Sequence, residues 1–243
     1  QGKRLSPLTD GRPKCLVPIA GRPILEWQIH ALAQAGVEDI SVVTGFCADE
    51  VDTMLMTTSV PAEVRTIFNP FYTVADNIGS CWAARDYLGD DTLLLNGDTL
   101  FEPAIAERVL KQATAPISVT VDRKDHYDSD DMKIMRDGDR LTAIGKALDL
   151  PVDGESIGMI RFQNGGGQRF VSAMRAALRD QETLKRWYLS IIDGLAKEGG
   201  VGLVSIEGLA WSEIDFLRDL PIAESKVARF LGTPEPALLS GAL

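Results

Sequence analysis

The stretch Thr92-Leu93-Leu94-Leu95-Asn96-Gly97-Asp98 is a continuous apolar run that ends in a polar turn. Such a run predicts a strand in the middle of a parallel sheet, where both faces are covered. The turn would place the carboxylate of Asp98 at the carboxyl edge of that sheet, which is where open α/β sheets bind ligands. Asp98 is therefore a candidate ligand-binding residue. The alternative is a plain turn residue that ends the strand.

Helical and extended patterns alternate around this strand. Their order predicts an α/β fold with a Rossmann-like, mostly parallel mixed sheet that is sandwiched by helices. In this half of the chain we predict helices over 24–36, 49–56, 79–88 and 103–112, and strands over 39–45 and 63–68.

The pattern changes after residue 115, where strands follow one another. Asp137-Gly138 predicts a hairpin between two of them, 131–135 and 141–144. No repeat or linker is visible, so we predict one domain over residues 1–243. The stretch Asn164-Gly165-Gly166-Gly167 is interpreted as a flexible turn instead of a phosphate loop, since we predict no strand–glycine–helix context around it. The remaining predicted elements are strands 117–121, 157–162 and 201–206 and helices 170–178, 182–197 and 215–223.

Charge and composition exclude several classes of protein. The formal net charge is −10, from 25 basic and 35 acidic residues, which argues against a nucleic-acid partner because such a partner needs a basic surface. The chain contains no apolar run of about 18 residues, so we expect no membrane insertion. The three cysteines are odd in number and lack CxxC spacing, and we expect reduced thiols and a cytoplasmic protein.

Two further segments carry candidate chemistry. Residues 1–14 hold four cations in a glycine- and proline-containing loop, which fits phosphate binding but also fits a solvated basic terminus. Trp211-Ser212-Glu213-Ile214-Asp215 places Glu213 and Asp215 on one side of an extended segment, although Asp215 could instead cap a helix. A phosphate loop with two strand-end carboxylates, Asp98 and Asp215, indicates a Mg²⁺–nucleotide site.

The opening pattern is longer and more specific than these signals. It reads Gly2-x-Arg4-Leu5-x-Pro7-Leu8-Thr9-x3-Pro13-Lys14-x-Leu16-x-Pro18-Ile19-x-Gly21-x-Pro23-Ile24-Leu25. This pattern resembles the signature of the nucleotidyltransferases that make NDP-sugars and related compounds. The resemblance implies their fold and their reaction, in which an acceptor phosphate attacks the α-phosphorus of an NTP and pyrophosphate leaves. It also implies a nucleotide-binding half, residues 1–115, and an acceptor-binding half, residues 116–243.

The same resemblance assigns roles to the residues that match. Arg4 and Lys14 would hold the triphosphate, and Asp98 and Asp215 would ligate Mg²⁺. The family pattern starts with an apolar strand, so we expect an N-terminal strand to be missing here. Gly2 and Gly97 are assigned to nucleotide binding.

Shorter motifs resemble a subgroup, the bacterial choline-phosphate and phosphonate cytidylyltransferases. They are Asn77-x2-Ser80, Met132-Lys133, Ile144-Gly145-Lys146, Gly154-Glu155-x-Ile157-Gly158, Trp187-Tyr188 and Trp211-x-Glu213-Ile214-Asp215. This likeness implies CTP and an acceptor such as phosphocholine. Lys146 would meet the acceptor phosphate, while Asn77 and Ser80 would face the nucleoside or only cap their helix. The residues assigned to the acceptor are Glu155, Trp187, Tyr188, Trp211 and Glu213. The tryptophans could instead be core residues, and we favour a core position for Trp187 because it lies in a predicted helix.

Several alternatives stay open at this level. The acceptor could be a sugar 1-phosphate paired with UTP, dTTP or GTP, or the domain could bind nucleotide without catalysis. The acidic stretch 125–131 could attract a cationic head group or be a solvated loop. A homodimer is compatible with the sequence and is left open.

Overall fold

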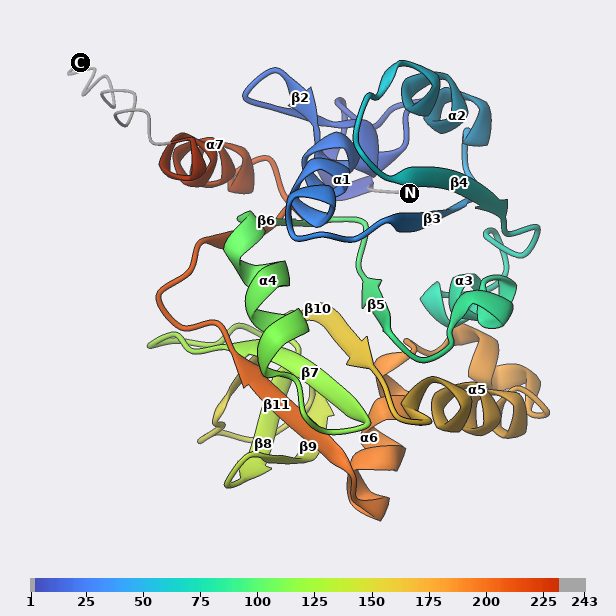
Figure 1. Ribbon diagram of the computed structural model, residues 1–243, viewed down its shortest axis with the longest axis vertical. Coiled ribbons are helices and arrows are strands. Elements are labelled where there is room, and N and C mark those ends of the chain that lie inside the picture. Colours follow the sequence, from blue (N-terminus) through green and yellow to red (C-terminus); the bar gives the residue numbers. More distant parts are fainter. Residues whose placement is uncertain (1–2, 232–243) are drawn as a thin grey trace.

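The computed structural model describes residues 3–231 and centres on a six-stranded sheet (Figure 1). Its strands are β5 (Thr92–Leu95), β7 (Ile117–Asp122), β8 (Lys133–Asp137), β9 (Arg140–Gly145), β10 (Gly154–Phe162) and β11 (Val201–Ser205). They lie in the order β5-β10-β7-β11-β9-β8, and β8 also pairs with the start of β10. The second pairing of β8 curls the strands into a small barrel-like sheet.

The direction of the strands differs from the sequence prediction. Within this sheet only β7 and β11 run parallel among the described pairings, and the others are antiparallel. A separate parallel pair is formed by β3 (Asp39–Thr44) and β4 (Glu63–Phe68). The α/β class and the mixed sheet are confirmed, but the mostly parallel, Rossmann-like arrangement is not. The reason is that β5 lies at an edge, beside the antiparallel β10, and that the predicted hairpin joins β8 to β9.

Helices cover both faces of this sheet. The buried strand β10 shows this directly, because Ile157 and Met159 pack on one side and Ile160 and Phe162 on the other. The first side is covered by α1 (Ile24–Gln34) and α4 (Pro103–Gln112), and the second by α5 (Gly166–Ala177) and α6 (Leu189–Glu198). The expected sandwich of helices is therefore present.

A third, smaller core lies at the amino-terminal end of the described chain. It packs Leu5 and Val17 against Leu100, Ile214 and Val227. These residues bring the basic segment together with the strand pair that carries the candidate acids. The elements that supply this core are η1 (Lys3–Leu5), β1 (Pro18–Ile19), α1, β6 (Thr99–Phe101) and α7 (Asp219–Phe230). The short elements η2 (Lys14–Leu16), β2 (Arg22–Pro23) and β12 (Trp211–Glu213) adjoin them in the chain.

Several predicted boundaries shift. The helix predicted over 79–88 is α3 (Asn77–Ala83) followed by the turn η3 (Arg85–Tyr87), and the helix predicted over 182–197 is η4 (Gln181–Lys185) followed by α6. Helix α7 begins at Asp219, four residues later than predicted, because the Asp219 carboxylate accepts the backbone N–H groups of Asp215 and Phe216. The remaining helix is α2 (Ala48–Thr57).

The glycine run 164–167 does join a strand to a helix. Gly165 ends this turn with a φ of 85°, and its N–H donates to the Asp90 carboxylate. A Cβ on Gly166 would lie 1.8 Å from the carbonyl oxygen of Pro116. These glycines serve close packing, which agrees with the interpretation as a turn.

The sequence led us to expect no membrane-spanning helix and no disulfide bond. None of the helices in residues 3–231 combines the length and the apolar character needed to cross a membrane. Cys15, Cys47 and Cys81 are all free thiols.

Candidate active site

A short strand pair brings the two candidate magnesium ligands together. β6 and β12 run antiparallel with Thr99 opposite Glu213, and the N–H of Ile214 donates to the carbonyl of Asp98 at 3.1 Å. Asp98 precedes β6 and Asp215 follows β12, so the pairing places both at the same end. Sequence analysis missed β6, although Thr99-Leu100-Phe101 is made of strand-forming residues.

Three carboxylates converge at this point. One oxygen each of Asp98, Glu213 and Asp215 lies within 4.8 Å of the others. The second oxygen of Asp98, Oδ1, is buried and has no hydrogen-bond partner among the described residues. A buried, unpartnered carboxylate oxygen is costly, which marks a place for a cationic ligand.

Lys14 joins two of these acids. Its Nζ donates to Asp98 Oδ2 at 2.7 Å and to Asp215 Oδ1 at 2.5 Å, across 84 and 201 residues of sequence. The Lys14 side chain is only 15% exposed. Burial lowers the pKa of Lys14, but the charges and hydrogen bonds of Asp98 and Asp215 outweigh burial, and the net pKa is raised. Lys14 therefore keeps its positive charge at neutral pH.

Glu213 is the outer member of the acid group. Loss of solvation around its carboxylate, together with the negative charges of Asp98 and Asp215, raises its pKa to about 7. The residue as a whole is nevertheless exposed to solvent. Glu213 is thus part of the acid cluster. The sequence analysis assigned it to acceptor binding and did not predict this neighbourhood.

Arg4 and Arg12, two other basic residues of the opening segment, pair with acids in different parts of the structure. Arg4 lies 3.5 Å from Asp130 and 4.0 Å from Asp215, with its guanidinium over the Phe216 ring. Arg12 pairs with Glu50 of α2 instead, at 3.8 Å. Gly2 lies outside the described residues. Of the predicted phosphate ligands, the fold thus gathers Arg4 and Lys14 at the acids.

A second group of side chains lies beside Arg4. The Nζ of Lys146 is 3.9 Å from Asp130 Oδ1 and 4.4 Å from the centre of the Trp187 ring. Trp187 is 41% exposed, so its indole is accessible to a ligand. Asp130 therefore lies between Arg4 and Lys146, which links the acidic stretch to the site. We call Lys146, Trp187 and Asp130 the open face.

Glu155 anchors the loop that carries Asp130. Lys124 lies 3.0 Å from Glu155 and 2.8 Å from Asp131, so it ties the loop to strand β10. Glu155 is buried, and burial raises the pKa of its carboxyl to about 7 although Lys124 opposes the shift. The structure thus places Glu155 behind the loop, where it is already paired.

The other two predicted acceptor residues belong to the scaffold. Tyr188 is buried, donates its hydroxyl to Asn96 Oδ1 at 3.0 Å and packs edge-on against Phe170. Trp211 is half-buried, and its Nε1 donates to Asp122 Oδ2 at 2.7 Å. Neither ring matches the exposure of Trp187. The core position that the helical pattern favoured for Trp187 is wrong, because this residue precedes α6 and its ring is exposed.

The predicted nucleoside contacts also have structural partners. Asp76 caps α3, so neither Asn77 nor Ser80 does. The side-chain oxygen of Asn77 accepts the N–H of Tyr188 at 2.9 Å, and Ser80 Oγ lies 3.3 Å from Asn69 Nδ2.

Gly97 stands exposed in the turn before Asp98. A Cβ at this position would meet nothing within 4 Å. The structure therefore gives no steric reason for glycine here, and its assignment to nucleotide binding stays a prediction.

Comparison with known proteins identifies related chains. The chain is 30% identical over 226 residues to the CMP-5'-(3-aminopropyl)phosphonate synthase of Streptomyces rubellomurinus, covering 88% of this chain and 35% of that protein. It is 24% identical over 254 residues to the CTP:phosphoglutamine cytidylyltransferase of Campylobacter jejuni, covering 93% and 96%. The chain therefore spans about a third of the first relative and nearly all of the second.

A solved structure shows the same fold. The CTP:phosphocholine cytidylyltransferase of Streptococcus pneumoniae superposes with a TM-score of 0.75 at 21% identity, covering 93% of this chain and 94% of that one. The family profile of the MobA-like NTP transferase domain matches residues 1–188, a range that includes Lys14, Asp98 and Lys146. On this match the chain belongs to the MobA-like NTP transferase domain family.

Proposed function

We propose that this protein transfers a cytidylyl group from CTP to a small phosphorylated or phosphonate acceptor and releases pyrophosphate. The observation that carries the proposal is the bridge from Lys14 to Asp98 and Asp215, beside the unpartnered Asp98 Oδ1. The names of the relatives, which specify CTP or a CMP product, support the choice of nucleotide.

The acid group fits Mg²⁺. This ion takes oxygen ligands, usually one or two carboxylates completed by water and phosphate oxygens. Asp98 and Asp215 would hold the ion, with Glu213 at the rim, and the buried Asp98 Oδ1 supplies an oxygen without another partner. When bound, Mg²⁺ offsets charge on the nucleotide phosphates and polarises the α-phosphate.

The chain itself supplies positioning and positive charge. In the proposed reaction an acceptor oxygen attacks the α-phosphorus, the bond from that phosphorus to the bridging oxygen breaks, and pyrophosphate leaves. Such a transfer needs reactants in line and neutralised charge more than covalent help from the protein. Lys14 and Arg4 lie beside the acids and are the cations available to the triphosphate.

The open face fits the acceptor. Lys146 would pair with the acceptor phosphate or phosphonate, because its side chain is 29% exposed beside Asp130, which also pairs with Arg4. The exposed ring of Trp187 and the carboxylate of Asp130 suit a positively charged group, since aromatic faces and carboxylates both attract ammonium ions. We therefore propose an acceptor that carries an amine or ammonium group near its phosphorus.

The test is pyrophosphate release by the full-length protein with Mg²⁺. CTP, UTP, dTTP, GTP and ATP are each paired with phosphocholine, 2-aminoethylphosphonate, glucose 1-phosphate and inositol 1-phosphate. We expect turnover with CTP and an amine-bearing acceptor. Turnover with a hexose phosphate alone would contradict the acceptor class, and nucleotide binding without turnover would favour a non-catalytic domain.

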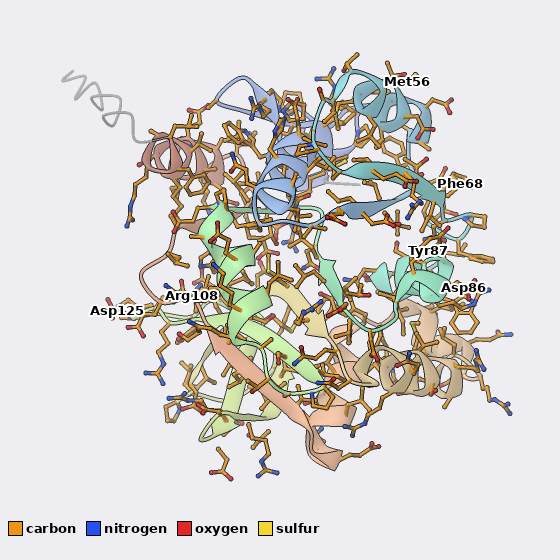
Figure 2. The ribbon with its side chains drawn as sticks, viewed as in Figure 1. Met56, Phe68, Asp86, Tyr87, Arg108 and Asp125 are labelled. Atoms are coloured by element: carbon orange, nitrogen blue, oxygen red, sulfur yellow. The ribbon has the colours of Figure 1, made fainter. Side chains whose placement is uncertain are left out.

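Matched variants separate the site from nonspecific effects. Asp98→Asn and Asp215→Asn should abolish turnover, whereas Asp86→Asn should leave it unchanged. Asp86 is suitable as the control because it lies on the outer surface and its side chain is 78% exposed (Figure 2). Full activity in both site variants would remove the metal assignment.

A further inference from the structure

Gln28 of α1 makes two contacts that the sequence does not suggest. This side chain is buried, with 3% exposure. Its Nε2 donates to the carbonyl oxygens of Asn96 and Thr99, each at 2.8 Å. These two carbonyls flank the turn that carries Gly97 and Asp98. One amide from a distant helix therefore holds both ends of the turn that presents the buried acid.

The backbone hydrogen bond that closes this turn is weak. The N–H of Thr99 reaches the carbonyl of Asn96 at 3.5 Å, which is long for a hydrogen bond. The contacts of Gln28 to the same region are much shorter. Residues 96–99 therefore depend on partners outside the turn for their geometry.

The opposite side of the turn is already fixed. The N–H of Asn96 donates to the carbonyl of Gly158 at 2.9 Å, and its side-chain oxygen accepts the hydroxyl of Tyr188. Thr99 Oγ1 donates to the carbonyl of Ile157 at 3.0 Å. Gly158 has a φ of 74°, and a Cβ there would lie 2.4 Å from Asn96 Nδ2. The N–H of Ile214 also donates to the carbonyl of Asp98, from β12. Gln28 adds a constraint from α1 that reaches both ends of the turn.

The Asp98 side chain cannot supply this constraint by itself. Its Oδ2 is held by Lys14, and its Oδ1 has no hydrogen-bond partner among residues 3–231. In the proposed reaction Lys14 also serves the triphosphate, so a carboxylate held by Lys14 alone would lose its position. Support through the backbone keeps Asp98 in place when Lys14 changes partner.

We infer that Gln28 is a positioning residue that sets the Asp98 turn for binding of a divalent cation. This inference rests on the proposed function. A neutral amide is suited to the role because its NH₂ group donates two hydrogen bonds, one to each carbonyl. Groups that orient a metal ligand typically change metal affinity or activity by about 10- to 100-fold when removed.

The variants are chosen to keep the helix intact. Gln28→Met removes both donors at similar length, and Gln28→Asn keeps the amide but is too short to reach both carbonyls. Gln34→Met is the matched control, because Gln34 is the exposed last residue of the same helix. Melting temperature shows which variants fold, and either Gln28 variant is sufficient for the test.

The primary measurement is titration with Mn²⁺, followed by the electron paramagnetic resonance signal of the free ion. We expect the Mn²⁺ dissociation constant of Gln28→Met to rise about tenfold or more. The kcat should fall while the KM for the acceptor stays unchanged. A lower melting temperature with wild-type Mn²⁺ affinity would mean that Gln28 is only a structural residue, and would overturn the inference.

A double variant distinguishes the inference from the proposed function. In an Asp98→Asn background, Gln28→Met should cause no further loss of Mn²⁺ affinity, because both changes act on one ligand. If Asp98→Asn and Asp215→Asn bind Mn²⁺ like the wild type, the metal site itself is wrong. If they lose affinity while Gln28→Met behaves like Gln34→Met, only the role of Gln28 is wrong.

Discussion

The Lys14 corner and the open face are built differently. In the corner, formed by Lys14, Asp98 and Asp215, the lysine is 15% exposed and contacts both acids within 2.7 Å. On the open face, Lys146 and Asp130 are 29% and 47% exposed, and their charges lie 3.9 Å apart. The side chains of the corner are thus less exposed and more closely paired than those of the open face.

This difference matches the two tasks of the proposed reaction. The triphosphate chemistry is common to all substrates of such an enzyme, so its groups gain from being held rigidly before binding. The acceptor differs among the relatives, which are named for phosphonate, phosphoglutamine and phosphocholine compounds. The open face is built from three separate loops, and loops can change their side chains without disturbing the core.

The largest effect should follow from the corner. Lys14→Met leaves Asp98 and Asp215 without their shared cation and removes a charge beside the triphosphate. We expect kcat to fall by at least about a hundredfold, the size seen when an electrostatic contact to the reacting group is removed. Steady-state pyrophosphate release measures this, with Lys111→Met as a control because Lys111 is 76% exposed on α4. Equal kcat values in the two variants would show that Lys14 contributes no more to catalysis than an exposed surface lysine.

The open face should affect the acceptor rather than the nucleotide. Lys146→Met removes the cation proposed to pair with the acceptor phosphate. We expect the KM for the acceptor to rise about 10- to 100-fold, because a hydrogen bond to a charged group contributes about 1.5–3 kcal/mol. The KM for CTP should change little. A larger change in the KM for CTP would place Lys146 in the corner instead.

Glu155, which lies on β10 behind the loop of Asp130, should give a pH dependence of stability. Burial raises the pKa of Glu155 to about 7, so the folded protein binds this proton more tightly than the unfolded chain does. The free energy of unfolding should therefore fall as pH rises from about 4.5 to 7 and then level off. In the wild type this fall in the free energy of unfolding should be on the order of 2 kcal/mol, and Glu155→Gln should abolish it.

Urea unfolding at pH 5 and pH 8 measures this difference. Glu182→Gln is the control, because Glu182 lies on η4 with a side chain that is 71% exposed. A wild-type pH profile in Glu155→Gln would show that Glu155 titrates normally and that Lys124 dominates its surroundings.

The smallest effect should come from the exposed indole. Trp187→Ala should raise the KM for an ammonium-bearing acceptor about two- to fivefold, since an exposed cation–π contact contributes about 0.5–1 kcal/mol. Its neighbour provides the contrast. Tyr188→Phe should leave this KM unchanged and lower the free energy of unfolding by about 1 kcal/mol, because it removes a buried hydrogen bond to Asn96. Acceptor kinetics and urea unfolding on both variants test the separation.

Much of the local structure could be predicted. Strand 63–68 and helix 103–112 match β4 and α4 residue for residue, and most other elements differ only at their ends. Asp98, Asp215, Lys14 and Arg4 were identified from residue type and motif, and the fold brings them together. The exposure of the aromatic residues was not predicted correctly, because Trp187 is exposed and the burial of Tyr188 depends on Phe170 and Asn96 from distant segments.

The sequence by itself determined which chemical groups are available and which short segments are helices or strands. These depend on residues a few positions apart, through side-chain periodicity and turn chemistry. The tertiary structure alone decided that β5 lies beside an antiparallel strand, that β6 pairs with β12, and that Lys14 joins Asp98 to Asp215. Such pairings depend on how distant apolar faces are buried together, and no local pattern encodes that choice. The support that Gln28 gives to the Asp98 turn is of the same kind, because α1 and β6 meet only in the folded protein.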